Sequence, residues 1–570
     1  MPQIQDELTK TAGFIQLIKI LVTDRIAREG IHLLYSQLPE AQIDERPGLK
    51  PDELKAIIGN YHALIVRSET QVTSDVLAAA TNLKIVGRAG VGVDNIDTEA
   101  ATRQGIIVVN SPTGNIIAAA EHTIAMLMAL TRHIPAADAN IKAGKWEKSR
   151  FLGIEVRNKV LGVIGLGKVG MAVARRAQGL EMQIIASDPF VSPEQARKAD
   201  VTMMSMEEVL QQADFVTLHT SLTSGSQGTR GLIGEHELQL MKPGARLINC
   251  ARGGLIDEEA LLKALNEKRL AGAALDVFSQ EPIRDNALLN QLVAHEHVIS
   301  TPHLGASTEE AQVGVATDVA EQIVLVLRGG LPRAAVNAPL ILPETLKTLQ
   351  PYMTLLEKMG RLYTQLQPGP LSKIELSYSG EIASYDLRPL QAALIKGLLE
   401  SVSEAHVNLI NAQLLAKERG LEIVEQKSTT PAEFANQVTL RVVSQNGHAS
   451  SLANDEDIDA LSGTVMHGEP RIVRMGRYWT EFVPEGYILF CRNIDQPGMI
   501  GHVGTILGKA GVNIRHMDVG PSVRKARAYD VQRPTEPALM VISVDNPISD
   551  RALQEIRKAG DIFGVKVVNL

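Results

Sequence analysis

The sequence predicts an α/β protein built on parallel, doubly wound sheets of the Rossmann-like type. Strand-length apolar runs alternate with helix-forming segments between residues 18 and 300. A G-x-G-x-x-G motif follows one of these runs and opens a helix-forming segment. Beyond it, Arg252, Glu281 and His303 follow further strand-like runs. Because open α/β sheets build their sites at the carboxyl ends of strands, this order predicts a nucleotide site beside a catalytic site.

The glycine motif is placed as a dinucleotide-binding loop requires. The apolar run 159–164 enters it, and the helix-forming segment 171–180 follows it. Gly165 permits the tight turn, Gly167 lets the backbone approach a pyrophosphate, and Gly170 lets the helix pack closely on the strand. The pyrophosphate would then lie at the helix N-terminus, where free N–H groups and the helix dipole favour an anion.

A carboxylate indicates which nucleotide binds. The run 183–187 is the second predicted strand of the unit, and it ends at Asp188, about 20 residues beyond the glycine motif. This carboxylate would accept hydrogen bonds from the ribose hydroxyls of NAD and repel the 2′-phosphate of NADP. NAD is therefore the predicted cofactor.

The Arg–Glu–His series indicates the reaction. A histidine such as His303 has an ordinary pKa near 6.5, so it can give and take a proton at neutral pH. Glu281 would bond to its far nitrogen, and Arg252 offers a planar fork that grips a carboxylate. Together they indicate a hydride-transferring dehydrogenase of 2-hydroxy acids. Cys250 lies beside Arg252 but has no neighbouring base in the sequence, so a cysteine nucleophile is disfavoured.

Four domains are expected, the first of them discontinuous. The helical pattern from Thr308 to Leu327 ends at Gly329-Gly330, a C-terminal cap signal, and we expect this helix to return to the first domain. The segment 334–485 also contains predicted strands and helices, but they do not alternate as regularly as those of residues 18–300. The predicted division is a flexible N-terminal extension (1–17), a substrate-binding domain (18–115 and 301–330), an NAD-binding Rossmann domain (116–300), an α+β intervening regulatory domain (334–485) and a ferredoxin-like C-terminal domain (486–570).

Composition excludes several classes of protein. A net charge of −8 without a long basic stripe argues against nucleic-acid binding. The sequence has no uninterrupted apolar run of about 18 residues, so no membrane-spanning helix is predicted. Two cysteines in 570 residues suit a reducing compartment, and no metal-ligand spacing occurs, so we expect a cytoplasmic enzyme without a metal site.

Five motifs are spread in order over more than half of the chain. They are Gly87–Asn95 (GRAGVGVDN), Gly165–Gly170 (GLGKVG), Asn249–Gly254 (NCARGG), Gly272–Phe278 (GAALDVF) and Thr301–Thr308 (TPHLGAST). On these motifs, residues 18–330 resemble the D-isomer-specific 2-hydroxyacid dehydrogenase family. The segment 334–485 resembles the intervening regulatory domain of its long-form members.

The resemblance implies further site residues and assigns Arg252, Glu281 and His303 to catalysis. The cofactor-binding set that it implies is Gly165, Gly167, Lys168, Val169, Gly170, Asp188, Thr220, Cys250, Ala251, Arg252, Asp276, His303, Gly305 and Ala306. Asp276 resembles the family carboxylate near the nicotinamide amide, and the backbone of Val91 and Gly92 should offer N–H donors to the substrate carboxylate. His122 and His219 are interpreted as packing histidines.

Two arginines indicate the substrate. Arg67 and Arg88 each follow a predicted strand of the first domain and should face the cleft between the domains. With Arg252 they are more than a simple 2-hydroxy acid needs, and they suit a phosphate, as in 3-phosphoglycerate, whose oxidation begins L-serine biosynthesis. The alternatives are a glyoxylate or hydroxypyruvate reductase of the same family and a non-enzymatic NAD-sensing protein. A side activity on 2-oxoglutarate stays open.

The last 85 residues, 486–570, indicate regulation. A strand, a D-x-P-G turn, a helix and a G-V-N-I strand are similar to an ACT domain, an amino-acid sensor of β-α-β-β-α-β order. Asn493, Asp495 and Asn513 are the candidate effector-binding residues, with Asn513 bridging between subunits. L-serine is the expected effector, and a homo-oligomer, dimer or tetramer, is the expected assembly.

Overall fold

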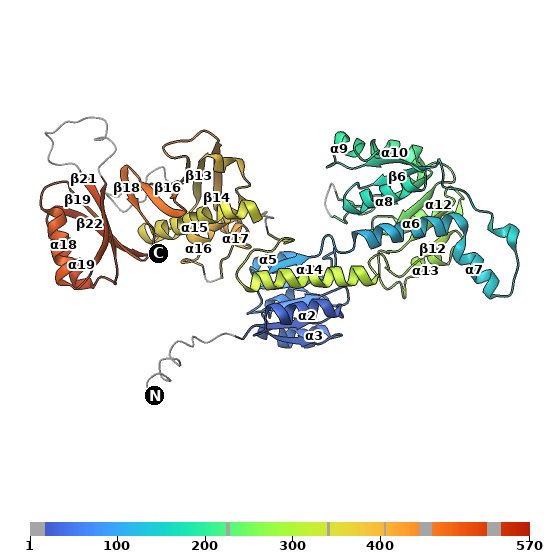
Figure 1. Ribbon diagram of the computed structural model, residues 1–570, viewed down its shortest axis with the longest axis horizontal. Helices are drawn as coiled ribbons and strands as arrows, with labels where there is room; N and C mark the ends of the chain where they lie inside the picture. The colour runs from blue at the N-terminus through green and yellow to red at the C-terminus, as the bar shows by residue number, and fades with distance from the viewer. Residues whose placement is uncertain (1–16, 224–227, 339–342, 404–405, 444–458, 521–536) are drawn as a thin grey trace.

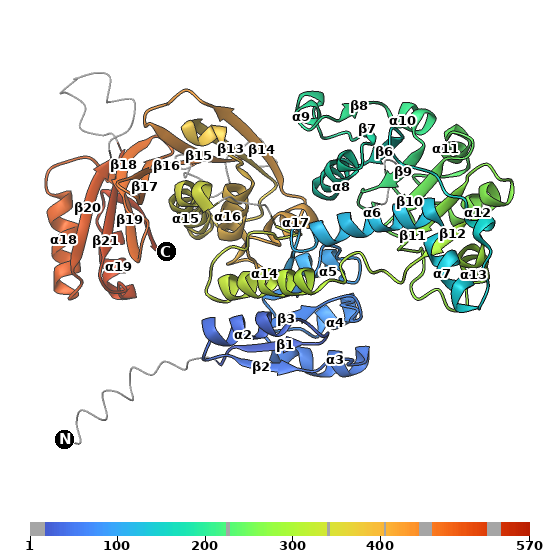
Figure 2. The ribbon, with the colours of Figure 1, turned by 45° about the vertical axis from the view of Figure 1, so that its right-hand side comes forward.

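The computed structural model describes residues 17–223, 228–338, 343–403, 406–443, 459–520 and 537–570. Four sheets follow one another through an elongated molecule. The seven-stranded sheet lies at one end and the C-terminal four-stranded sheet at the other, in both views (Figures 1 and 2). The N-terminal extension expected over 1–17 lies, apart from Leu17, outside the described residues.

The first sheet is parallel, with strand order β2-β1-β3-β4-β5. Its strands are β1 (Lys19–Val22), β2 (Gln42–Glu45), β3 (Ala63–Val66), β4 (Ile85–Arg88) and β5 (Ile107–Asn110), and its helices are α2 (Arg28–Gln37), α3 (Pro51–Ile57), α4 (Ser74–Ala78) and α5 (Thr98–Arg103). Short buried apolar strands alternating with amphipathic helices account for this layering, because both faces of the sheet must be covered.

The long helix α14 (Glu309–Leu327) returns to this sheet from the far end of the second domain. Thr308 caps its first turn by accepting from the Ala311 N–H at 3.2 Å. Its buried Val319 and Ile323 belong to the core under the first sheet, where a side chain at Gly87 would overlap Val319. Helix α14 therefore packs with the first sheet although the whole second sheet separates them in the sequence.

The second sheet is also parallel, with order β12-β11-β10-β9-β6-β7-β8. Its strands are β6 (Val160–Ile164), β7 (Gln183–Ser187), β8 (Thr202–Met203), β9 (Phe215–Leu218), β10 (Arg246–Asn249), β11 (Gly272–Leu275) and β12 (Val298–Ser300). Helices cover both faces: α6 (Ile116–Arg132), α8 (Lys168–Gly179), α9 (Pro193–Arg197), α10 (Met206–Gln212), α11 (Glu235–Leu240), α12 (Glu258–Asn266) and α13 (Ala287–Ala294). The strand order reverses between β6 and β9, which is where such sheets bind nucleotides.

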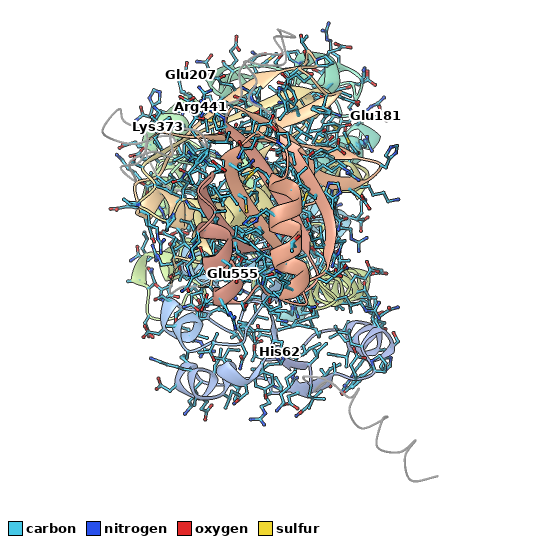
Figure 3. All side chains as sticks on the ribbon, turned by 90° about the vertical axis from the view of Figure 1, so that its left-hand side faces the viewer. His62, Glu181, Glu207, Lys373, Arg441 and Glu555 are labelled. Atoms are coloured by element: carbon cyan, nitrogen blue, oxygen red, sulfur yellow. The ribbon has the colours of Figure 1, made fainter. Side chains whose placement is uncertain are left out.

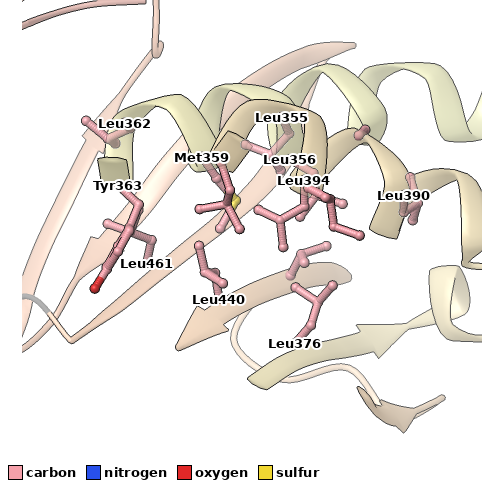
Figure 4. Close-up of a cluster of buried hydrophobic side chains, with 14 of the residues drawn as sticks. Leu355, Leu356, Met359, Leu362, Tyr363, Leu376, Leu390, Leu394, Leu440 and Leu461 are labelled. Atoms are coloured by element: carbon pink, nitrogen blue, oxygen red, sulfur yellow. The ribbon is translucent and has the colours of Figure 1, made fainter. Parts of the chain in front are cut away.

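The third sheet is mixed and has six strands, β14-β13-β15-β16-β17-β18. Its elements are α15 (Pro343–Leu366), β13 (Lys373–Gly380), α16 (Arg388–Leu399), α17 (Ala412–Glu418), β14 (Glu422–Ser428), β15 (Asn436–Val443), β16 (Ala460–Met466), β17 (Glu469–Met475) and β18 (Tyr478–Phe482). Figure 4 shows its core, in which leucines of α15 and α16 pack against strand residues such as Leu376 and Leu440. Alternating buried and half-buried residues along β13 explain why only one face meets these helices.

The fourth sheet is antiparallel, with order β20-β21-β19-β22. The elements run β19 (Tyr487–Ile494), α18 (Met499–Lys509), β20 (Ile514–Gly520), β21 (Pro537–Val544), α19 (Asp550–Arg557) and β22 (Ile562–Asn569), which is the predicted β-α-β-β-α-β order. Figure 3 looks onto this unit from outside, with the two helices in front of the strands.

The third and fourth sheets share a core. Along β19, Leu489 and Cys491 face the cluster beneath α18 and α19, whereas Ile488 and Phe490 belong to the cluster that fills the intervening domain. Leu539, Val541 and Val568 join them there, against Leu366, Tyr478 and Phe482. Both faces of the C-terminal sheet are therefore buried, one by its own helices and one by the preceding domain.

The fold class is confirmed: two Rossmann-like parallel sheets, a mixed α+β unit and a ferredoxin-like C-terminal unit. No helix within the described ranges is long and apolar enough to cross a membrane. Over those same residues, no cluster of histidine, cysteine and carboxylate side chains has the geometry of a metal site.

Candidate active site

The glycine loop between β6 and α8 has the geometry that its sequence predicts. Gly165 has φ +92°, and a Cβ there would lie 2.6 Å from the His219 carbonyl oxygen. A Cβ at Gly170 would lie 2.1 Å from the Gly165 oxygen. At Gly167 a Cβ would meet no atom within 4 Å, and no side chain caps the first turn of α8. The loop thus leaves open space and uncapped N–H groups where a pyrophosphate would lie.

Asp188 and Thr220 flank this loop. Asp188 accepts hydrogen bonds from the N–H groups of Leu166 at 2.8 Å and Phe190 at 2.7 Å, so it holds the loop in addition to ending β7. The Thr220 hydroxyl, after β9, is buried without a hydrogen-bond partner among the described residues. A buried polar group of this kind calls for a ligand partner, so the residues present fit a bound dinucleotide.

His303 and Glu281 meet as the sequence predicts. His303 Nδ1 lies 2.6 Å from a Glu281 oxygen, and the other oxygen accepts from the Phe278 N–H at 2.9 Å. Burial acts to raise the pKa of Glu281, but the hydrogen bonds from His303 and Phe278 outweigh it and leave that pKa below its usual value. The imidazole therefore has an ionised carboxylate behind it, and its other nitrogen, Nε2, is left for the chemistry.

The loop that carries His303 is fixed by Asp276, which is fully buried. His303 has φ +55°, a left-handed conformation uncommon for a residue with a side chain. Its N–H donates to the Asp276 carbonyl at 2.9 Å, while the N–H groups of Leu304 and Gly305 donate to the two carboxylate oxygens at 2.7 and 2.8 Å. Asp276 therefore shapes the turn that presents the imidazole.

Cys250, between β10 and Arg252, is not prepared for nucleophilic attack. Burial, reinforced by the nearby Asp276 carboxylate, raises the pKa of the Cys250 thiol to about 12. Since the thiolate is the nucleophilic form, this cysteine is inert at neutral pH.

Arg252 reaches across the cleft to the first domain. Its Nη1 donates to the Ala251 carbonyl at 2.7 Å, and its Nε lies 3.3 Å from the Asp94 carboxylate. A Cβ at Gly92 would lie 2.2 Å from Arg252 Nη2, so the glycine admits the guanidinium. In the part of the chain that the structure describes, the N–H groups of Val91 and Gly92 make no recorded hydrogen bond.

Arg67, Arg88 and Arg252 form a cationic cluster at the strand ends. Arg88 lies over Gly90, and burial together with Arg252 and Arg67 lowers its pKa to about 10. Its buried Nε has no partner among the described residues. These three guanidinium groups are close enough to influence one another's charge, and one of them has an N–H donor without a partner among the described residues. Such a cluster predicts an anionic ligand.

Sequence reasoning missed three acidic or basic residues of the site. The buried Asp24 accepts from the N–H of Arg67 at 2.5 Å and holds that loop. Asp94 pairs with Arg252, and His122, interpreted as packing, instead lies 3.1 Å from the Thr301 hydroxyl and 3.2 Å from Asp276. For Asp24 a signal existed, because this carboxylate comes two residues after the apolar run that ends at Val22 and so lies at a strand end.

The three candidate effector-binding residues of the C-terminal unit, Asn493, Asp495 and Asn513, differ in their surroundings. Asn493 is buried, its amide N–H₂ donates to the Ile494 carbonyl at 2.7 Å, and its carbonyl oxygen is unpaired among the described residues. α18 starts at Gly498 without a side-chain cap. Asn513 donates to Asp545 of the same chain at 2.6 Å, and Asp495 is exposed.

Three family models match the chain. Residues 124–305 match the NAD binding domain of the D-isomer specific 2-hydroxyacid dehydrogenases, 348–476 match the D-3-phosphoglycerate dehydrogenase intervening domain, and 487–561 match the ACT domain. The three matches follow the order of the three C-terminal sheets.

Characterised relatives span almost the whole chain. D-3-phosphoglycerate dehydrogenase of Synechocystis is 43% identical over 97% of this chain and 95% of its own length. The protein of that name from Methanocaldococcus jannaschii is 41% identical over 97% and 100%. The solved TT0316 protein of Thermus thermophilus covers 56% of this chain and all of its own, with 32% identity and a TM-score of 0.50.

The two parallel sheets, the glycine loop and the His–Glu pair define a dinucleotide-binding 2-hydroxyacid dehydrogenase. Within that class, the chain belongs to the D-3-phosphoglycerate dehydrogenase family.

Proposed function

We propose that this protein oxidises 3-phospho-D-glycerate to 3-phosphooxypyruvate with NAD, the first step of L-serine biosynthesis. The observation that carries the proposal is the cationic cluster of Arg67, Arg88 and Arg252 beside the His303–Glu281 pair. The cluster supplies charge for a substrate with two anionic ends, and the pair supplies a proton acceptor. The names of the full-length relatives support the same substrate.

Catalysis rests on three side chains. NAD, when bound, accepts the hydride that leaves C2 of the substrate. His303 takes the proton of the C2 hydroxyl at Nε2, because its Nδ1 is engaged by Glu281. Glu281 stabilises the imidazolium that results, and Arg252 holds the substrate carboxylate next to the reacting carbon.

The remaining site residues keep the roles expected from the sequence. Arg67 and Arg88 bind the phosphate, and the N–H groups of Val91 and Gly92 serve the carboxylate. The cofactor is held by residues of the glycine loop and of the strand ends that face it: Gly165, Gly167, Lys168, Val169, Gly170, Asp188, Thr220, Cys250, Ala251, Arg252, Asp276, His303, Gly305 and Ala306. Asp276 in addition shapes the His303 turn, because its two carboxylate oxygens accept backbone hydrogen bonds from Leu304 and Gly305.

A substrate panel followed by NADH absorbance tests the proposal. Oxidation of 3-phosphoglycerate should far exceed that of glycerate, with hydroxypyruvate, glyoxylate and 2-oxoglutarate tested in the reducing direction. Faster reduction of glyoxylate or hydroxypyruvate than of 3-phosphooxypyruvate would favour the reductase alternative. Absence of turnover on the whole panel, with NADH still bound, would favour a non-enzymatic NAD sensor.

The C-terminal unit is proposed to bind L-serine as an effector, with Asn493, Asp495 and Asn513 contributing. Support comes from the match to the ACT domain and the unpaired carbonyl oxygen of the buried Asn493. Calorimetry of L-serine with the full chain is the test, and alanine is the control ligand. No heat, together with activity indifferent to serine, would leave this unit with a structural role only.

A homo-oligomer, dimer or tetramer, is proposed from an apolar arm of the second domain. Ile134, Ile141, Trp146 and Leu152 lie on the segment that includes α7 (Ile134–Lys142), and Trp146 is 84% exposed. Exposed apolar residues gathered in this way are typical of an interface.

We further propose the domain boundaries given above from the sequence and a cytoplasmic location. The two unpaired cysteines support that location, because they suit a reducing compartment.

A further inference from the structure

A buried polar network lies where the chain passes between the first two domains. The chain crosses twice, once before α6 and once between β12 and α14. The first crossing contacts α14, the helix that follows the second, because a Cβ at Gly114 would lie 2.8 Å from Val315 and one at Gly314 would lie 3.2 Å from the Gly114 oxygen. His122, two turns into α6, reaches the second crossing: its Nε2 lies 3.1 Å from Thr301 Oγ1 and 3.2 Å from Asp276 Oδ1.

The proton positions in this network follow from its acceptors. Thr301 Oγ1 donates its one hydrogen to Asp276 Oδ1 at 2.6 Å. The hydroxyl and the carboxylate are then both acceptors toward His122, so Nε2 carries a hydrogen and donates to them. His122 is therefore a hydrogen-bond donor to Thr301 and Asp276.

The same carboxylate fixes the turn that presents the catalytic histidine. Asp276 accepts from the N–H groups of Leu304 and Gly305 through its side chain and from that of His303 through its carbonyl. His303 holds a left-handed backbone conformation, which persists only where the surrounding structure imposes it. Anything that lets Asp276 rotate would let the imidazole drift from its place.

We propose that His122 is a positioning residue, which clamps Asp276 and Thr301 so that His303 keeps its orientation. The inference rests on the proposed dehydrogenase function, since it assigns His303 to proton transfer. His122 links α6, which follows the first crossing, to Thr301 and Asp276, which precede the catalytic turn.

The test compares His122→Leu, which removes the donor, with His122→Gln, which restores an N–H donor at similar reach. Glu121→Gln is the matched control, because Glu121 neighbours it on α6 but pairs at the surface with Arg176 at 2.9 Å. The leucine variant should lose about 10- to 100-fold in kcat, as expected for a misplaced catalytic group, with KM and the Kd for NADH within about threefold of wild type. The glutamine variant should recover most of the loss.

A second readout separates positioning from general damage to the fold. With substrate deuterated at C2, the isotope effect on kcat should rise in His122→Leu, because the chemical step becomes rate-limiting. A leucine variant with kcat within twofold of wild type would overturn the inference. A loss shared by KM, NADH binding and thermal stability, not rescued by glutamine, would assign His122 to packing. If wild type fails on 3-phosphoglycerate, the comparison is made on whichever 2-hydroxy acid it oxidises, so the two proposals fail separately.

Discussion

The catalytic half of the chain, residues 17–338, and the C-terminal half, 343–570, which we propose to be regulatory and call the regulatory half, differ in the direction of their strands. In the catalytic half all strands are parallel, so their carboxyl ends meet along one edge and the following residues gather there. In the regulatory half the sheets are mixed or antiparallel, and successive strand ends point to opposite edges. The position of a polar residue along the sequence therefore indicates a site in the first half far more directly than in the second.

Unsatisfied buried polar atoms make the same contrast. In the catalytic half, those of Arg88 and Thr220 lie at the cationic cluster and the nucleotide loop, although Ser111, Asn115 and Arg269 also carry such atoms. In the regulatory half, those of Arg361, Tyr378 and Asn493 lie on three separate elements. In the catalytic half, two of these atoms thus coincide with residues that the motifs had already selected, which gives them a meaning that their counterparts in the other half lack.

The largest effect should come from the proton acceptor. We expect His303→Ala to lower kcat by about 10²–10⁴-fold, the usual contribution of general acid–base catalysis, with NADH affinity nearly unchanged. Steady-state kinetics and NADH fluorescence titration measure the two quantities. His297→Ala, which changes a partly exposed histidine near β12, should have no such effect. An alanine variant that keeps most of its rate would remove His303 from the mechanism.

The second largest effect should be on substrate recognition. We expect Arg88→Gln to raise KM for 3-phosphoglycerate by about 10- to 100-fold, because a hydrogen bond to a charged group contributes about 1.5–3 kcal/mol. KM for hydroxypyruvate, which has no phosphate, should change little, and the exposed Arg46→Gln is the control. Equal losses on both substrates would assign Arg88 to the carboxylate instead. Arg252→Lys should weaken both, since the fork geometry is lost.

The cofactor preference should shift by a smaller factor. Asp188→Ala should raise the ratio of kcat/KM for NADP over NAD by about tenfold, because carboxylate–phosphate repulsion is removed. Asp188 also holds the Leu166 N–H, so Asp188→Asn, which keeps an acceptor, separates the loss of charge from loosening of the loop. A wild type that already uses NADPH as well as NADH would contradict this role.

The smallest effect concerns the contact between the two halves. Helix α17 lies near α5 (Figure 2). Asn408, in the loop before α17, donates to the Gly105 carbonyl after α5 at 2.7 Å, and Arg103 of α5 forms an ion pair with Glu418 of α17. Asn408→Ala should cost about 0.5–1.5 kcal/mol of stability at most and leave kcat without serine unchanged. Any inhibition by serine should weaken, which dose–response curves would measure, with Arg28→Gln as the control. If inhibition by serine is the same in Asn408→Ala as in wild type, the Asn408 contact does not transmit it. The covalent connection at Gly329-Gly330, after α14, would then be the remaining path between the two halves.

The sequence was sufficient for the fold class, and it indicated which candidate site residues lie at strand ends. Gly165, Asp188 and His303 follow strands whose apolar character is unmistakable, so their meeting edge could be inferred. The role of Asp276 could not, because its partners come from α6 and from the turn after β12, and only the folded chain brings them to one carboxylate. The contacts of His122 with Thr301 and Asp276 could not be inferred either, because those residues lie far from α6 in the sequence.

The packing of the C-terminal unit against the intervening domain also could not be predicted from the sequence. The run Tyr487–Cys491 is apolar at every position, which signals a strand covered on both faces without naming what covers it. The structure supplies the answer in the core shared by Ile488 and Phe490 with Leu366 and Tyr478.

That shared core decides how the protein can be taken apart. A truncation at residue 486 would expose Ile488, Phe490 and Leu539 to water on one piece and uncover Tyr478 and Phe482 on the other. Fragments cut there should aggregate, whereas a cut within 339–342 leaves this core intact. A graft of the C-terminal unit onto another enzyme should therefore carry the intervening domain with it, because the two complete one core.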